Sequence, residues 1–252
     1  MLPYRDENET QRPAIVTWAI IGLNVLSWIL VQGAGTTIPL ARSVCELGLI
    51  PGSLTGSLPA GARFPMGDGL VCRIDPDHQV WHLLTSMFMH GSWMHLLGNM
   101  WFLWIFGNNV EDAMGRLRFV IFYLLAGLAA AIGQVAANPA SPFPMVGASG
   151  AISGVMGGYL VLYPNVRVFT LVPIGFFLTS VALPAWVVLG YWFLIQFVSG
   201  LAAFGGGMGG VAFWAHVGGF VAGVVLVKLF ARSDYLAAHR THSWRPRRLL
   251  RG

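Results

Sequence analysis

A serine and a histidine stand inside two apolar, glycine-rich stretches of this chain. Ser149 lies in the run Gly-Ala-Ser-Gly over 147–150, and His216 lies in the run Ala-His-Val-Gly-Gly over 215–219. Polar groups at membrane depth are costly in free energy and usually mark a functional site. A serine hydroxyl beside a histidine that can take its proton is a nucleophile for acyl transfer. The two stretches therefore predict a serine–histidine hydrolase inside a bilayer; the alternative is that Ser149 is a small packing residue.

Six apolar segments must position these side chains, and each is near the ~20 residues that cross the hydrocarbon of a bilayer. They run over roughly 14–33, 92–109, 117–137, 147–163, 182–203 and 210–230. Hydrophobic residues make up 56% of the chain and charged residues 10%, which is too apolar for a soluble domain of this length. The expected fold is an all-α polytopic membrane protein, a bundle of six transmembrane helices with a large outer first loop.

Positive charges are distributed unevenly about these segments. Twelve Lys and Arg residues fall at the two chain ends, around 110–118 and in the 164–181 loop, whereas Arg42, Arg63 and Arg73 fall on the opposite face. Cytoplasmic segments carry the excess of Lys and Arg, so both termini are expected in the cytoplasm. The basic tail is suited to anionic lipid, and we expect no nucleic-acid partner. Fourteen Arg against one Lys fits a GC-rich bacterial genome, so a bacterial plasma membrane is the expected location.

The chain divides into one membrane domain with two short polar ends. We expect a cytoplasmic N-terminal segment over 1–13, the six-helix membrane domain over 14–231 and a basic cytoplasmic tail over 232–252. The outer loop insert, 34–91, is the one large non-membrane part of the domain. Its last part, from His78 to His90, is apolar but interrupted by polar groups, which is typical of an interfacial or re-entrant element.

The insert contains Cys45 and Cys72, the only cysteines of the chain. The charge distribution places both on the outer, oxidising face, in a Gly- and Pro-rich region with little core of its own. Such a region is commonly stabilised by a disulfide, so we expect these two residues to be bonded. Two free thiols are the alternative. We expect the bond to organise the loop and to take no part in catalysis.

Depth in the membrane decides whether the serine and the histidine can meet. Ser149 falls in the first turn of its segment, and His216 falls about six residues into its own, or ~9 Å from the same face. Gly150, Gly219 and Gly223 leave room for the two helices to pack closely. Backbone N–H groups at the start of the Ser149 helix lack intrahelical partners and could bind an oxyanion. Because the segments hold no Asp or Glu, we expect a dyad rather than a triad.

A second polar group lies at the start of the 92–109 segment. Asn99 follows His95 by four residues, on the same helix face, and both can donate a hydrogen bond to a developing oxyanion without a formal charge. A metal site at His82, His90 and His95 is the weaker interpretation, since His90 and His95 would be ~140° apart on a helix and no His-Glu-x-x-His pattern is present. We therefore expect no metal and no cofactor. Interfacial histidines bonded to the backbone are the remaining alternative.

Together these residues resemble the rhomboid family of intramembrane serine proteases, over roughly 79–230. The resemblance implies that Ser149 is the nucleophile and that His216 is the general base. It further implies that Asn99, His95 and the backbone N–H of Ser149 hold the oxyanion. The implied activity is endopeptidase cleavage of single-span membrane proteins near the outer membrane face.

Other positions match the family pattern less uniformly. Glu111 and Gly115 match its turn after the second helix. Where many members have Trp-Arg in the first outer loop, this chain has Trp81-His82. Where some members carry an aromatic residue one turn after the nucleophile, able to pack on the catalytic histidine, this chain has Ser153. The histidine is therefore expected to be oriented differently or more loosely here.

Two other functional classes share some of these features. A catalytically inactive rhomboid-like protein that binds membrane clients would have the same fold, but such proteins typically lack the serine or the histidine. A proton-coupled transporter could use His90, His95 and His216 as a proton path, but it would more often show paired acidic residues within its spans, and this chain has none there. The sequence leaves the substrate and the oligomeric state open.

Overall fold

Six helices of the computed structural model lie where the sequence predicts apolar segments, within a few residues at each end. The structure describes residues 1–67, 69–74, 80–203 and 211–242, so His78 and the last ten residues of the basic tail lie outside the described residues. The six helices are α1 (Ile15–Leu30), α5 (Trp93–Met114), α6 (Arg116–Ala137), α7 (Ser149–Leu162), α8 (Ala185–Ala202) and α9 (Phe213–Phe230).

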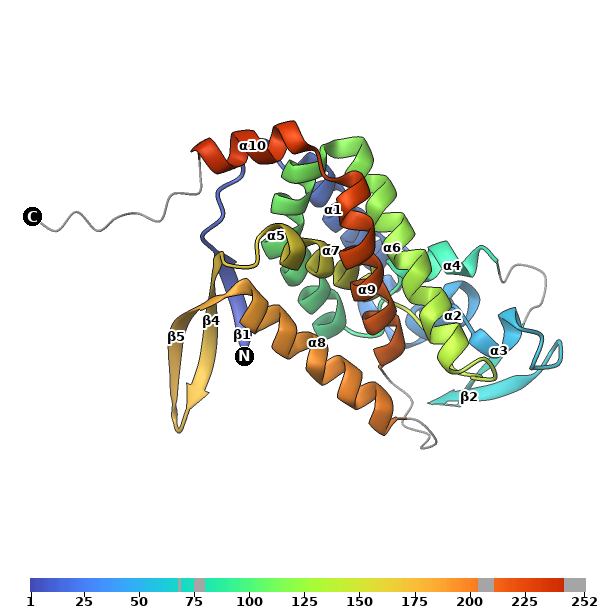
Figure 1. Ribbon diagram of the computed structural model, residues 1–252. Helices are drawn as coiled ribbons and strands as arrows, with labels where there is room; N and C mark the ends of the chain where they lie inside the picture. The colour runs from blue at the N-terminus through green and yellow to red at the C-terminus, as the bar shows by residue number, and fades with distance from the viewer. Residues whose placement is uncertain (68, 75–79, 204–210, 243–252) are drawn as a thin grey trace, which may run out of the picture.

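Helix α7 is the centre of this bundle. It contacts α5, α6, α8 and α9, and it has a run of buried residues from Gly150 to Tyr159 (Figure 1). Among the described helices, α6, α8 and α9 are long and apolar enough to cross a membrane by themselves, whereas α1 and α7 are apolar but shorter. The predicted count of six spans therefore stays a prediction, although a helix is present at each predicted position.

Glycines bring α7 and α9 into backbone contact. A Cβ atom added at Gly219 would fall on the carbonyl oxygen of Gly150, and one added at Gly223 would fall on that of Gly154. Any larger residue at these positions would push the helices apart, so the glycines explain how α7 and α9 can bring short side chains within reach of each other.

The start of α1 is fixed by a buried acid at the end of α5. The Glu111 carboxylate accepts hydrogen bonds from the backbone N–H groups of Val16 and Thr17, at 2.9 and 2.7 Å, and from the Thr17 hydroxyl at 2.8 Å. First-turn N–H groups have no intrahelical partner, so a carboxylate is a favourable ligand for them. Gly115, with φ +78°, then separates α5 from α6.

The expectation of an all-α fold is wrong, since the described residues form two antiparallel sheets. Strands β1 (Leu2–Asp6), β4 (Arg167–Ile174) and β5 (Phe177–Pro184) form an antiparallel sheet in that order, where the sequence analysis expected a polar N-terminal segment and a 164–181 loop. The cause is local: β-branched and aromatic residues make up five of the eight residues of β4, and β5 adds Phe177, Thr179 and Val181. Its two-residue turn places Gly175 at φ +59°, a conformation that tight hairpins require and glycine adopts readily.

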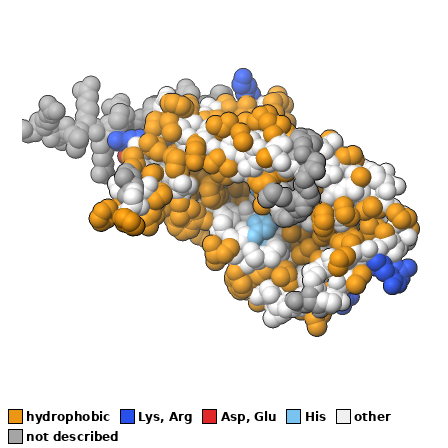
Figure 2. Space-filling model, turned by 90° about the horizontal axis from the view of Figure 1, so that it is seen from below, with side chains coloured by type: hydrophobic (Ala, Val, Ile, Leu, Met, Phe, Trp, Pro, Cys, Tyr) orange, Lys and Arg blue, Asp and Glu red, His pale blue; other side chains and the backbone are white. Residues whose placement is uncertain are grey.

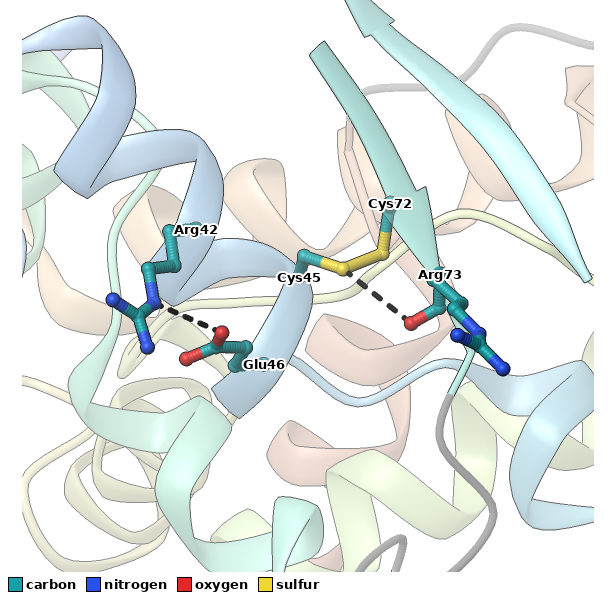
Figure 3. Close-up of a disulfide and its surroundings, with 5 residues drawn as sticks. All are labelled: Arg42, Cys45, Glu46, Cys72 and Arg73. Atoms are coloured by element: carbon teal, nitrogen blue, oxygen red, sulfur yellow. Dashed lines mark hydrogen bonds and ion pairs between the residues drawn. A yellow bond between two sulfur atoms is a disulfide. The ribbon is translucent and has the colours of Figure 1, made fainter. Parts of the chain in front are cut away.

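The 34–91 insert is a set of short elements at the other end of the molecule from α10 (Ser233–His242) (Figure 1). These elements are a 3₁₀ turn η1 (Gly33–Gly35), α2 (Thr37–Leu47), α3 (Pro51–Leu54), β2 (Arg63–Gly67), β3 (Leu70–Arg73), α4 (His82–Thr85) and a 3₁₀ turn η2 (Ser86–Phe88). A disulfide between Cys45 and Cys72 joins α2 to β3, with 5.5 Å between the Cα atoms (Figure 3). Cys72 packs beside buried Ile50 and Ile74, which gives the insert a small core of its own.

Candidate active site

The structure brings Ser149 and His216 into contact. Ser149 is the first residue of α7 and His216 the fourth of α9, and the Ser149 Oγ lies 2.8 Å from the His216 Nε2. The close packing of α7 on α9 at their glycines sets this distance. A hydroxyl and an imidazole nitrogen at this separation can pass a proton directly.

A third side chain, which the sequence analysis missed, fixes the histidine from its other side. The Nδ1 atom of His216 lies 2.7 Å from the Oε1 atom of Gln196, on α8. An amide oxygen can only accept, so Nδ1 carries the proton and the Nε2 lone pair faces Ser149. This is the tautomer that a general base needs. His216 therefore has a neutral hydrogen-bond partner, whose signal in the sequence is a glutamine within an apolar segment.

The aromatic neighbour of His216 also comes from α8. The Trp192 ring lies 5.8 Å from the His216 ring, between centroids, at an interplanar angle of 38°. Ser153, at the position where some relatives carry an aromatic residue, instead donates its hydroxyl to the Ser149 carbonyl oxygen at 2.6 Å. In place of an aromatic contact from that position, His216 has a ring contact with Trp192 and a hydrogen bond with Gln196, so it is not loosely held.

His95 faces the nucleophile with a defined tautomer. The Ser92 side chain caps α5 by accepting from the His95 backbone N–H at 3.1 Å, which fixes His95 in the first turn. Its Nδ1 atom accepts the Gly91 backbone N–H at 3.3 Å, so the hydrogen is on Nε2. That Nε2 atom points at Gly147, where an added Cβ would lie 2.7 Å from it. Gly147 has φ +131°, so both space and conformation require glycine there.

Asn99 offers a donor that is not used within the described residues. It is buried one turn after His95 on α5, and its Nδ2 atom has no hydrogen-bond partner among them. A buried donor without a partner is costly, so it usually has a functional or solvent partner. Asn99 and His95 both line the cavity that contains Ser149, as the sequence analysis expected for oxyanion donors.

His90 does not join this donor set. Gln32 holds its backbone, with hydrogen bonds of 2.8 Å to its N–H and 2.7 Å to its carbonyl oxygen, and its ring meets that of His95 edge-on at 5.1 Å between centroids. The described part of the chain contains no cluster of three His, Cys, Asp or Glu residues that could hold a metal ion, His82, His90 and His95 included.

The site opens into a cavity of about 840 Å³. Residues of α5, α7, α8 and α9 line it, among them Phe102, Trp192 and Met156, and it reaches the segment Phe143–Val146 that precedes α7. Figure 2 shows the molecule hollowed on this face, with a histidine side chain inside the hollow and hydrophobic side chains around it. The volume is sufficient for several residues of an extended peptide together with water.

These features define a class: a helical protein with an apolar surface, whose serine and histidine meet beside hydrogen-bond donors in an open cavity. A family model described as Rhomboid domain matches residues 77–233, which is more than half of the chain. The chain therefore belongs to the rhomboid family. Its membership and its apolar helices make it an integral membrane protein.

Relatives with assigned names agree with this membership. The chain is 35% identical to rhomboid protease GluP of Bacillus subtilis over 130 residues. This match covers 52% of this chain and 24% of that protein. It is 37% identical over 87 residues to putative rhomboid protease YdcA of Bacillus subtilis, 34% of this chain and 43% of that protein. Rhomboid-like protease 5 of Toxoplasma gondii is 31% identical over 154 residues, 58% of this chain and 16% of that protein. The matched part is less than half the length of each of these relatives.

Proposed function

We propose that the protein is an intramembrane serine endopeptidase that cleaves single-span membrane proteins. The observation that carries this proposal is the 2.8 Å contact between the Ser149 Oγ and the His216 Nε2. Asn99 lines the same cavity, and its Nδ2 atom has no hydrogen-bond partner among the described residues. Relatives named as rhomboid proteases support the same chemistry.

The proposed reaction follows from the positions of the donors and acceptors. The Ser149 Oγ attacks a peptide carbonyl carbon and its proton passes to the His216 Nε2. The carbonyl oxygen becomes an oxyanion that accepts from the Asn99 amide, the His95 Nε2–H and the Ser149 backbone N–H. The His216 proton then passes to the leaving amine, and the peptide bond breaks to give an acyl-enzyme.

Hydrolysis of the acyl-enzyme completes the cycle. A water molecule gives a proton to His216 and attacks the ester carbonyl carbon, again through an oxyanion. Collapse of this intermediate returns the proton to the Ser149 Oγ and releases the new carboxyl terminus. The open cavity gives water a route to Ser149.

The proposed substrate is a transmembrane segment that unwinds near its end. The surface of the bundle carries exposed apolar side chains such as Leu125, Leu194 and Val225, which suits a lipid surrounding. Ser149 and His216 lie at the helix ends that the charge distribution assigns to the outer membrane face, with both chain termini cytoplasmic. Cleavage would therefore fall close to that face of a bacterial plasma membrane.

Reconstitution into lipid vesicles tests the proposal. Wild-type protein and Ser149→Ala are incorporated with a panel of single-span membrane proteins, and the products are analysed by mass spectrometry. We expect cleavage of at least one substrate, near one end of its span, by the wild type alone. Binding of these substrates without cleavage by the wild type would instead favour an inactive client-binding protein, and proton flux across the vesicle membrane would favour a transporter.

A further inference from the structure

One face of α8 is built around the candidate general base. Trp192, Phe193, Gln196 and Gly200 recur at helical spacing, and all of them are partly or fully covered, whereas Leu194 and Val198 between them are exposed. This is the period of a helix that turns one face to a neighbour and the other to solvent or lipid. Gln196 is the member of this set with an amide side chain, and that side chain reaches His216.

The aromatic residues of this face pack α8 against α9 at His216 and at Phe220, one turn further along α9. The Trp192 ring stacks on Phe220 at 6.1 Å and also lies 5.8 Å from the His216 ring, between centroids. Phe193 packs on Phe220 at 4.8 Å. His216 and Phe220 are one turn apart on α9, just as Trp192 and Gln196 are one turn apart on α8. Trp192 thus contacts the imidazole ring of His216, and Gln196, one turn later on α8, contacts its Nδ1 atom.

A neutral third residue suits this location. A carboxylate in an apolar helix would be strongly disfavoured unless it were paired and hydrogen-bonded. A glutamine amide can accept from the Nδ1–H without a formal charge, and its other end remains a donor. It therefore supplies the tautomer and the orientation of the base, but less stabilisation of the imidazolium than a carboxylate would supply.

We propose that Gln196 is a positioning residue for His216, and that with Trp192 it makes α8 the orienting element of a Ser149–His216–Gln196 triad. This inference rests on the proposed function. Gln196 acts through the histidine: it holds the Nδ1 proton, so that the Nε2 lone pair points at the Ser149 Oγ. Trp192 restricts the rotation of the same ring.

The test measures the rate at which a fluorophosphonate labels Ser149, because that rate depends on nucleophile activation and needs no protein substrate. Gln196→Leu removes the acceptor with little change in size, and we expect it to lower the labelling rate about tenfold to a hundredfold, since a base misplaced by about 1 Å can lose about 10²-fold. In cleavage assays the loss should appear in kcat rather than in KM. Val198→Leu, on the exposed face of α8, is the matched control and should keep the wild-type rate.

Gln196→Glu provides a readout that a merely structural role would not change. A carboxylate still accepts from Nδ1–H, so we expect at least partial rescue of the labelling rate at neutral pH. It also stabilises the imidazolium, so the acid limb of the pH profile should move to higher pH than in the wild type. Trp192→Phe should remain near the wild type, whereas Trp192→Ala should be slower by about two- to tenfold.

The outcomes separate this inference from the proposed function. Wild-type protein that never labels at Ser149 would overturn both. Wild-type labelling with an equal rate in Gln196→Leu would overturn the triad alone. If Gln196→Leu does not fold, the pH profile of Gln196→Glu decides: an acid limb that moves to higher pH supports the triad, and an unchanged one overturns it.

Discussion

The two ends of the helix bundle use polar side chains in opposite ways. At the end near α10, the Asp112 carboxylate accepts from Arg12 at 3.0 Å and lies 3.2 Å from the Nδ1 atom of His239. At the other end, the Asn99 amide faces the cavity without a hydrogen-bond partner among the described residues, close to Ser149. The same helix, α5, carries both Asn99 and Asp112, so the contrast lies within one element.

Strand β1 connects the end of the bundle near α10 to α7, the helix that carries Ser149. Its Asp6 carboxylate accepts from the Asn109 side chain on α5 at 2.9 Å and from the Tyr159 hydroxyl on α7 at 2.5 Å. One side chain thus joins the two helices that carry Asn99 and Ser149 at their opposite ends. The comparison indicates that the hydrogen bonds of Asp6 and Asp112 fix α5 and α7 at one end. In the proposed mechanism, this rigidity lets the other end hold donors ready for an oxyanion.

Removal of the reacting groups should have the largest effect. Ser149→Ala and His216→Ala are each expected to reduce proteolysis by about 10⁴-fold or more, because neither residue can activate the reaction without the other. Both proteins should remain folded in detergent, since the contact between the two side chains is a small part of the α7–α9 interface. Rates near the wild type in either variant, measured with a fluorogenic or gel-based cleavage assay, would refute the assignment.

Two asparagines of α5 sharpen the comparison between the ends. Asn99→Ala should lower kcat by about 10²–10³-fold, or about 2.7–4 kcal/mol, if its amide is the main oxyanion donor. Asn109→Ala, ten residues or ~15 Å further along the helix, is the matched control. It should lower thermal stability through the lost Asp6 contact and leave kcat close to the wild type. A larger loss of kcat in Asn109→Ala than in Asn99→Ala would contradict the division of roles.

Loss of the disulfide should affect stability and not chemistry. It closes 27 residues of sequence, for which chain entropy gives roughly 3–4 kcal/mol of stabilisation of the insert. Cys45→Ser with Cys72→Ser should therefore make 34–91 more sensitive to proteolysis, with kcat near the wild type. Mass spectrometry of non-reduced protein from membranes should detect the linked peptides, whereas two alkylatable thiols in fresh membranes would refute the bond.

The smallest expected effect is a pH dependence of stability from Asp6. Burial raises the pKa of Asp6 to about 7, so the folded protein holds this proton more tightly than the unfolded chain does. The resulting stabilisation is present below about pH 4 and is lost as the pH rises through about 7. About two pH units of linkage are worth about 2.7 kcal/mol, and 1 kcal/mol shifts the Tm of a chain of this size by about 2–4 °C. Tm should therefore fall between pH 5 and pH 8 by about 5–10 °C more in the wild type than in Asp6→Asn. Equal slopes in the two proteins would contradict this role of Asp6.

Features that depend on local sequence could be predicted. Ser149 and His216 each stand in a run of small residues, and their depths follow from where the apolar segments begin. The positions of the six helices also follow from local composition, because each coincides with an apolar segment. The β4–β5 hairpin could also have been found locally, because β-branched residues flank Gly175-Phe176, but its length and its single Arg167 made it resemble a cytoplasmic loop.

Features that depend on packing between distant segments could not be predicted. Asp6 meets Asn109 and Tyr159 across 103 and 153 residues of sequence, and nothing near Asp6 specifies either partner. Gln196 is a single glutamine in an apolar helix, and its partner depends on how α8 rotates against α9. The predicted spans contain no Asp or Glu to orient His216, and an uncharged acceptor such as a glutamine has no comparable signal in the sequence.

Identification of the labelled residue tests the central claim most directly. Wild-type protein in lipid vesicles is treated with a fluorophosphonate, digested and sequenced by mass spectrometry, beside His216→Ala and Ser149→Ala. We predict a single phosphonylated serine, Ser149, in the wild type, and loss of the label in both variants. Labelling of another serine, or equal labelling of Ser149 in His216→Ala, would contradict a serine nucleophile activated by His216.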